Sequence, residues 1–138
     1  MKLKKIFNDD SLPVGIGLLR ISFGLMLTFV HGWGTFKGFI NGVKDFPDPI
    51  GLGSRFSMGL MGFSEFICAL LVAFGIYMRL ALIPIITGFL VAFFIFHSGD
   101  PFGTKEMAFH YLIVFLVLFL TGPGKYTMKD IIKYNRKG

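Results

Sequence analysis

Four apolar blocks constrain what this chain can fold into more than any other feature of its sequence. They cover residues 12–30, 57–77, 80–96 and 107–120. A helix needs about 20 residues to cross the roughly 30 Å hydrocarbon core of a bilayer, with about 17 as a lower limit. The first two blocks meet this length, the third is short, and the fourth reaches the limit only with flanking residues. The pattern predicts an all-α fold, an antiparallel bundle of four transmembrane helices.

Composition supports the same interpretation and argues against a water-soluble bundle. The chain is 54% hydrophobic and only 16% charged, whereas soluble domains are roughly 45–50% apolar and about 25% charged. The charged residues also cluster between the apolar blocks, so they cannot cover a water-facing surface. We therefore expect residues 1–138 to form a single integral membrane domain.

The lysine and arginine residues predict the orientation of this bundle. With four spans, both termini and the second loop share one side of the membrane and carry nine of these residues, against four on the other side. The richer side is normally cytoplasmic, so both termini are expected in the cytoplasm. The net charge of +6 then indicates contact with anionic membrane lipids, and nucleic acid is not an expected partner. The basic residues at the chain ends are Lys2, Lys4, Lys5, Lys125, Lys129, Lys133, Arg136 and Lys137.

Two charged residues lie in the middle of apolar blocks, Arg20 in the first and Glu65 in the second. Each costs about 2.5–3.5 kcal/mol at a helix centre on insertion scales, so such residues usually face the bundle interior and pair. The sequence predicts an interior ion pair between Arg20 and Glu65. The alternative to a functional role is that this pair only clamps two helices together, without chemistry.

A second polar group is expected at the outer ends of the helices. His31 and His97 follow the first and third blocks, and Glu106 and His110 stand at the start of the fourth. Residues four apart share a helix face, so Glu106 and His110 should point the same way. We predict that these residues and Glu65 converge on a cavity in the outer half of the bundle, open towards the periplasm. The alternative is that they face headgroup water separately.

The residue types restrict what such a cavity could bind. Histidine and glutamate side chains could hydrogen-bond a quinone head group, ligate a b-type haem or bind a metal ion. No two histidines share a helix, so the pattern favours a quinone or similar amphiphile over haem or metal. The single cysteine, Cys68, excludes an internal disulfide, a C-x-x-C redox motif and a covalent c-type haem. It is expected to be a small buried side chain, and no residue is assigned a catalytic role.

The longest predicted loop covers residues 31–56 and is rich in glycine and proline. Both residue types commonly mark turns. We therefore expect the first helix to end near His31 and to be followed by turns and a short interfacial helix.

The order of several short motifs resembles the DoxX family of small bacterial membrane proteins, over nearly the whole chain. The motifs are Leu19-Arg20, His31-Gly32-Trp33-Gly34, Glu65, Gly75-Ile76-Tyr77-Met78-Arg79-Leu80-Ala81, His97 with Asp100-Pro101-Phe102-Gly103, Lys105-Glu106 and Gly122-Pro123-Gly124-Lys125-Tyr126. Two positions depart from the family pattern. Relatives often carry a lysine where this chain has Thr35, with Lys37 two residues later. His110 replaces an expected apolar residue, which weakens it as a metal or haem ligand.

The resemblance implies a four-helix bundle in the bacterial inner membrane. It also implies a subunit of a quinone-linked oxidoreductase or of an oxidative-stress complex, without a redox centre of its own and therefore with a redox partner protein. More distant relatives resemble membrane chaperones or cargo receptors. A non-catalytic scaffold, chaperone or binding protein for lipids or small amphiphiles therefore stays open, as does an oligomeric state.

Overall fold

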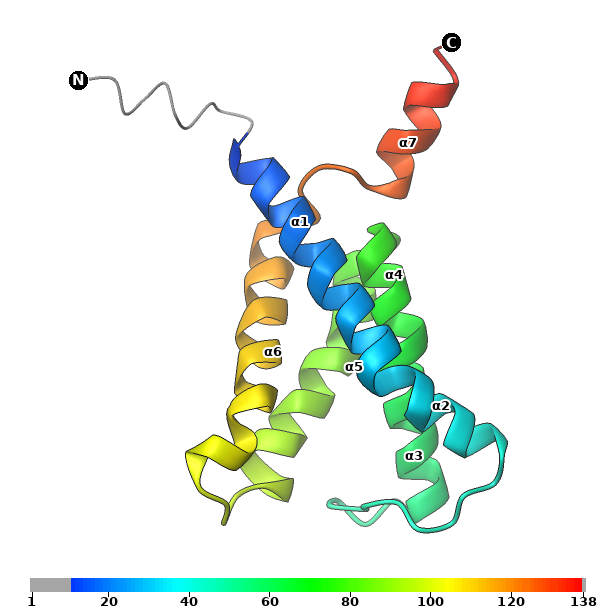
Figure 1. Cartoon of the computed structure of the whole chain (residues 1–138), viewed down its shortest axis with the longest axis vertical. Helices are drawn as coiled ribbons and strands as arrows, with labels where there is room; N and C mark the ends of the chain where they lie inside the picture. The colour runs from blue at the N-terminus through cyan, green and yellow to red at the C-terminus, as the bar shows by residue number, and fades with distance from the viewer. Residues whose placement is uncertain (1–10, 138) are drawn as a thin grey trace, which may run out of the picture.

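The structure, a computed structural model, describes residues 11–137 and is built from helices joined by short connections (Figure 1). Four helical spans are long and apolar enough to cross a membrane. They contain 30, 21, 19 and 20 residues in chain order, and they alternate in direction. These spans are Ser11–Ile40, Ser54–Phe74, Met78–Phe96 and Phe102–Thr121. The predicted all-α antiparallel bundle of four transmembrane helices is confirmed.

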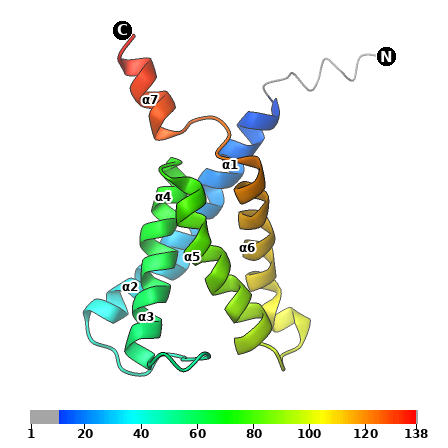
Figure 2. The same ribbon diagram turned by 180° about the vertical axis from the view of Figure 1, so that it is seen from behind.

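The two ends of the bundle are built differently (Figures 1 and 2). One end, called here the terminal end, holds the start of α1, the turn at residues 75–77 and the loop at residues 122–127. The other end, called the loop end, holds the connections at residues 41–53 and 97–101. The side of the membrane that each end faces stays a prediction, and Lys2, Lys4 and Lys5 lie outside the described residues.

The first span is ten residues longer than the apolar block predicts at its C-terminal side. Helix α1 (Ser11–Met26) continues through the π-helical segment η2 (Leu27–Gly32) into α2 (Trp33–Ile40) without a break. The prediction that the helix ends near His31 is therefore wrong, and the loop begins only at residue 41.

The glycines at the contact between the first two spans allow the helices to pack closely. The sequence had suggested turns for the glycines after His31. A Cβ atom added to Gly32 would lie 2.2 Å from the carbonyl oxygen of Glu65. One added to Gly62 would lie 3.1 Å from the Cα atom of Phe36. Small residues let helix backbones approach this closely in membranes. Glycine composition alone does not distinguish a turn from such a contact.

Three of the four spans contain a π-helical segment. Besides η2, these are η3 (Phe63–Cys68), between α3 (Ser54–Gly62) and α4 (Ala69–Phe74), and η4 (Ala92–Phe96), which follows α5 (Met78–Val91). A π-helical turn inserts an extra residue and re-aims the side chains around it, and such turns are frequent at functional sites. His31 and Glu65 lie within two of these segments, and His97 directly follows the third.

The terminal end is shaped by glycine stops and a helix cap. Gly75 ends α4 with φ +68°, and the N–H of Ile76 donates back to the Leu71 carbonyl at 2.9 Å. This is the glycine-stopped helix end that only a residue without a Cβ adopts easily. Helix α6 (Phe102–Thr121) ends at Gly122, and the short helix α7 (Met128–Asn135) begins after Thr127, whose side chain caps it.

The core fills the space between the four spans. Its side chains are apolar, and several are fully buried. Fully buried apolar members are Leu27, Ala69, Val72, Leu82, Ile85, Phe115 and Leu118. The predicted burial of Cys68 is also confirmed, at 3% exposure.

Candidate functional site

Arg20 is fully buried at the terminal end, and backbone carbonyl groups accept all of its hydrogen bonds. Its Nε donates to Pro123 O at 2.8 Å. Its Nη2 donates to Lys125 O and Tyr126 O, both at 3.0 Å. Its Nη1 donates to the Val72 and Ala73 carbonyls at the end of α4. The guanidinium group therefore ties α1, α4 and the loop at residues 122–127 together.

The predicted ion pair between Arg20 and Glu65 is wrong. The last carbonyls of a helix have no partner within it, and those of α4 lie next to Arg20. The loop at residues 122–127 also returns to α1, where the N–H of Lys125 donates to Pro13 O at 2.9 Å. These carbonyls satisfy Arg20, while Glu65 lies two turns earlier on the second span. Arg20 clamps these parts of the chain together by itself, without the glutamate that the predicted clamp would have used.

Glu65 is buried at 8% exposure in η3. It lies where η3 touches η2, since Gly32 packs directly on the Glu65 backbone. The Thr35 side chain of α2 lies beside the Glu65 carboxyl group. A carboxyl group thus stands inside the bundle next to a neutral hydroxyl group.

Tyr111 of α6 packs against His31. The His31 ring packs edge-on against the Tyr111 ring, with 5.7 Å between the centroids. On its other side Tyr111 stacks on Phe89 at 5.2 Å. The Thr35 hydroxyl group also donates to the His31 carbonyl at 3.3 Å. Glu65, Thr35, Tyr111 and His31 form what we call the interior polar cluster.

A pocket of about 480 Å³ reaches Glu65 from the loop end. It lies between the second and third spans, and the loop at residues 46–52 forms part of its wall. His97 also lines it. Four of the apolar lining residues are about half exposed on the outer surface of the spans, where lipid would lie: Leu60, Phe63, Ile83 and Phe96. An apolar molecule could therefore enter the pocket from the bilayer.

The loop that borders this pocket is held in place by Asp48. Its carboxylate accepts hydrogen bonds from the Ser57 hydroxyl group and from the N–H groups of Leu52 and Gly53, each at 2.8 Å. The hydrogen bond from Ser57, followed by those from the backbone, holds the pKa of the Asp48 carboxyl group below its ordinary value. The loop is therefore ordered by an ionised Asp48.

The structure brings only part of the predicted polar group together. Glu65 and His97 line the pocket, and the His97 Nδ1 lies 2.6 Å from an Asp100 carboxylate oxygen. His31 lies in the interior polar cluster and does not line the pocket.

Glu106 and His110 do share a face of α6, with 3.8 Å between their polar atoms, but their side chains are 53% and 62% exposed. The predicted convergence in one cavity is wrong for these two residues. Ala108, Tyr111 and Leu112 occupy the buried face of this helix.

The same arrangement bears on the metal and haem hypotheses. Within residues 11–137, no three His, Cys, Asp or Glu side chains lie close enough together to bind a metal ion. Each histidine contacts a different neighbour: Tyr111, Asp100 or Glu106. The histidines therefore do not face one another as a pair of axial haem ligands would.

Sequence reasoning missed three residues of this region: Thr35, Tyr111 and Asp48. Thr35 was noted only as a departure from the family pattern. Tyr111 lies one residue after His110 in an apolar block, so nothing marked it as facing inwards. Asp48 did carry a local signal, because an aspartate before proline and glycine commonly accepts hydrogen bonds from the backbone of its own turn.

Comparison with known families decides the relationship of the chain. The model of the DoxX family matches residues 15–98. The chain belongs to the DoxX family. The match covers Arg20, His31, Glu65 and His97, and it ends before α6. No curated protein and no solved structure gives a significant match. Family membership and the four apolar spans together establish a multi-pass membrane protein of the DoxX family.

Proposed function

We propose that this DoxX protein binds a quinone-like amphiphile in the pocket at Glu65, as a membrane subunit of a quinone-linked oxidoreductase system. The observation that carries the proposal is the pocket itself, which is apolar, reachable from lipid and bordered by a buried carboxyl group. In the same proposal the protein lies in the bacterial inner membrane with both termini in the cytoplasm, because its basic residues concentrate on that side.

The lining fits the two parts of such a ligand. An isoprenoid or alkyl tail would lie against Leu60, Phe63 and Phe96, and the head group would lie nearest Glu65. A quinone head group supplies two-electron, two-proton redox chemistry when bound. The protein would supply the pocket, exclude water from it, and hold a proton or a hydrogen bond at the Glu65 carboxyl group. The redox centre that exchanges electrons belongs to a partner protein.

A binding titration tests this proposal. The purified protein is titrated with a short-chain quinone analogue and, separately, with a saturated alcohol of equal chain length. We expect saturable binding of the quinone analogue and at least about ten-fold weaker binding of the alcohol. We expect Glu65→Gln to weaken quinone binding about 10- to 100-fold, the range that hydrogen bonds to charged groups contribute.

Glu106→Gln is the matched control, because it makes the same chemical change at an exposed position outside the pocket. It should bind as the unchanged protein does. Absence of saturable quinone binding, or equal binding by the Glu65→Gln protein, would contradict the proposal.

A second function is supported by Arg20. Its complete pairing with carbonyl groups shows that this chain uses one buried charge for packing alone. A non-catalytic scaffold or binding protein for lipids or small amphiphiles is therefore the alternative. It is favoured if the alcohol and the quinone analogue bind equally well and both depend on the apolar lining.

A further inference from the structure

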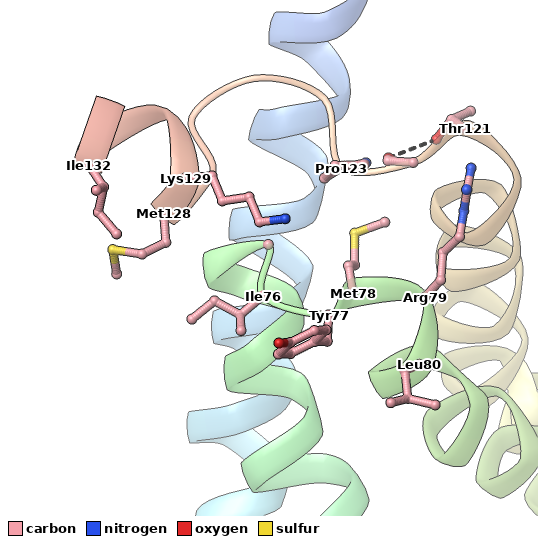
Figure 3. Close-up of a pocket in the computed structure, with 12 residues that line it drawn as sticks. Ile76, Tyr77, Met78, Arg79, Leu80, Thr121, Pro123, Met128, Lys129 and Ile132 are labelled. Atoms are coloured by element: carbon pink, nitrogen blue, oxygen red, sulfur yellow. Dashed lines mark hydrogen bonds between the residues drawn. The ribbon is translucent and has the colours of Figure 1, made fainter. Parts of the chain in front are cut away.

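A second pocket, of about 710 Å³, lies at the terminal end of the bundle (Figure 3). It is formed by the turn after α4, the start of α5, the end of α6 and the first turns of α7. This pocket is separate from the one at Glu65. Two of the family motifs, at residues 75–81 and 122–126, supply much of its lining, although the sequence predicted no cavity here.

Two cations line the pocket, Arg79 and Lys129. The Arg79 Nε donates to the Phe119 carbonyl at 3.1 Å, which fixes the guanidinium group beside the end of α6. Within residues 11–137 its two Nη groups have no hydrogen-bond acceptor. Figure 3 shows the Lys129 side chain running from α7 towards the bundle, above Ile76 and Tyr77. The two cations come from elements far apart in the sequence and reach one cavity.

The rest of the lining is apolar and continues onto the outer surface. Tyr77 and Leu80 line the pocket and are 79% and 69% exposed. Ile132 of α7 also lines it and is 47% exposed. A ligand with a charged group in the pocket could therefore extend an apolar part along Leu80 towards the bilayer.

Helix α7 has the pattern of a helix that lies at a membrane surface. Its apolar residues Met128 and Ile132 are four apart, and Lys129 and Lys133 are four apart beside them, so each pair shares a face. Short amphipathic helices of this kind lie in the headgroup region. Figures 1 and 2 both show α7 standing away from the spans, joined to them by the loop at residues 122–127.

Among the described residues of the terminal end, the acidic side chain is that of Asp130, and it is already engaged. Asp130 accepts from the Thr127 N–H at 3.0 Å, and the Asp130 N–H donates to the Thr127 hydroxyl group. This cap holds the pKa of the Asp130 carboxyl group below its ordinary value. Its hydrogen bonds go to the start of α7, so Arg79 and Lys129 are not paired with it.

We propose that this pocket binds the headgroup of an anionic phospholipid. The phosphate would lie between Arg79 and Lys129, and the acyl chains would follow Leu80. A guanidinium group and an ammonium group together are a common phosphate-binding set. The bound lipid would join α7 to the four spans and would fix this end of the bundle in the headgroup layer.

Native mass spectrometry of the full chain in detergent tests the proposal. Short-chain phosphatidylglycerol is the probe, and phosphatidylcholine of the same chain length is the comparison. We expect phosphatidylglycerol to bind at least about ten-fold more tightly, because the choline group is repelled by the two cations. Each cation near a membrane surface contributes about 1 kcal/mol to the binding of an anionic lipid. We therefore expect Lys129→Gln to weaken phosphatidylglycerol binding about five-fold. The double variant with Arg79→Gln should weaken it about 25-fold.

Lys37→Gln together with Lys44→Gln is the matched control, since it removes two exposed cations at the loop end and should leave phosphatidylglycerol binding unchanged. Lys129→Gln alone keeps the test decisive if the Arg79 change impairs folding, because Lys129 is exposed on α7. The proposal is overturned if the two lipids bind equally, if Lys129→Gln binds as the unchanged protein does, or if soluble glycerol 3-phosphate binds as tightly as the lipid.

Discussion

Arg20 at the terminal end and Glu65 towards the loop end are both buried charged residues in apolar helices, yet the structure treats them in opposite ways. Arg20 donates to five carbonyl groups from two separate parts of the chain. Glu65 makes no ion pair among residues 11–137; the neutral Thr35 side chain lies beside it, and it borders a pocket. A buried charge with all of its hydrogen bonds used holds a fold together, whereas a buried charge beside a pocket is free to meet a ligand.

The two ends of the bundle also differ in the charged residues on their surfaces. Around the terminal end the described charged residues are mainly cations, and the acid Asp130 is used as a helix cap. At the loop end the cations Lys37, Lys44, Arg55 and Lys105 are accompanied by the acids Asp45, Asp48, Asp100 and Glu106. One end is therefore suited to anionic headgroups, while the other holds its loops with local hydrogen bonds and ion pairs.

The largest effect is expected at the clamp. Arg20→Ala would leave several buried carbonyl groups without a donor, so we expect it to lower the free energy of unfolding by at least about 3 kcal/mol. Arg55→Ala removes an exposed guanidinium group 5.0 Å from the Phe39 ring and should cost less than about 1 kcal/mol. Unfolding of both variants in the same detergent measures the difference. Equal losses would show that Arg20 is not the clamp.

Two glycines of the first span, Gly32 and Gly34, provide a matched test of the contact between η2 and η3. Gly32→Ala would place a Cβ 2.2 Å from the backbone oxygen of Glu65, and such overpacking typically costs about 1–3 kcal/mol. An added Cβ at Gly34 has no atom within 4 Å, so Gly34→Ala should be neutral or stabilise the helix by up to about 1 kcal/mol.

Thermal unfolding of the two glycine variants, together with quinone binding, measures this contrast. We expect Gly32→Ala also to weaken quinone binding, because it displaces the segment that carries Glu65. If the two variants behaved alike, close packing of η2 on η3 would not position the carboxyl group.

The smallest effect is expected at Asp48, and it depends on pH. The folded pKa of its carboxyl group is below the unfolded value, so its contribution to loop stability is complete above the unfolded pKa. That contribution is lost as the pH falls through the lower, folded pKa. We expect Asp48→Asn to lower the hydrogen-exchange protection of Leu52 and Gly53 a few-fold at pH 6 and by less at pH 2.

Asp45→Asn is the control, since it removes an exposed carboxylate from the same loop. Its protection factors at residues 51–53 should equal those of the unchanged protein at both pH values. A similar loss of protection in the Asp45 variant would mean that the net charge of the loop, and not the Asp48 hydrogen bonds, orders it.

Much of the fold could be predicted because hydropathy is a local property. The number of spans follows from the apolar blocks, and the burial of Arg20, Glu65 and Cys68 follows from their positions inside those blocks. The length of the first span could not be predicted in the same way. From the sequence, Gly32 and Gly38 look like turn residues. Only the structure shows that the second span packs closely against them.

The sequence by itself thus determined a four-span DoxX membrane protein with two buried charges, because a helix in lipid satisfies its backbone internally and needs only enough apolar length. Tertiary structure alone decided what those charges meet. The partners of Arg20 are carbonyl groups at the end of α4 and in the loop at residues 122–127, 52 to 106 residues away. Which carbonyl groups remain unpaired, and which helix face closes over Glu65, depends on how the finished helices pack, and no local pattern encodes it.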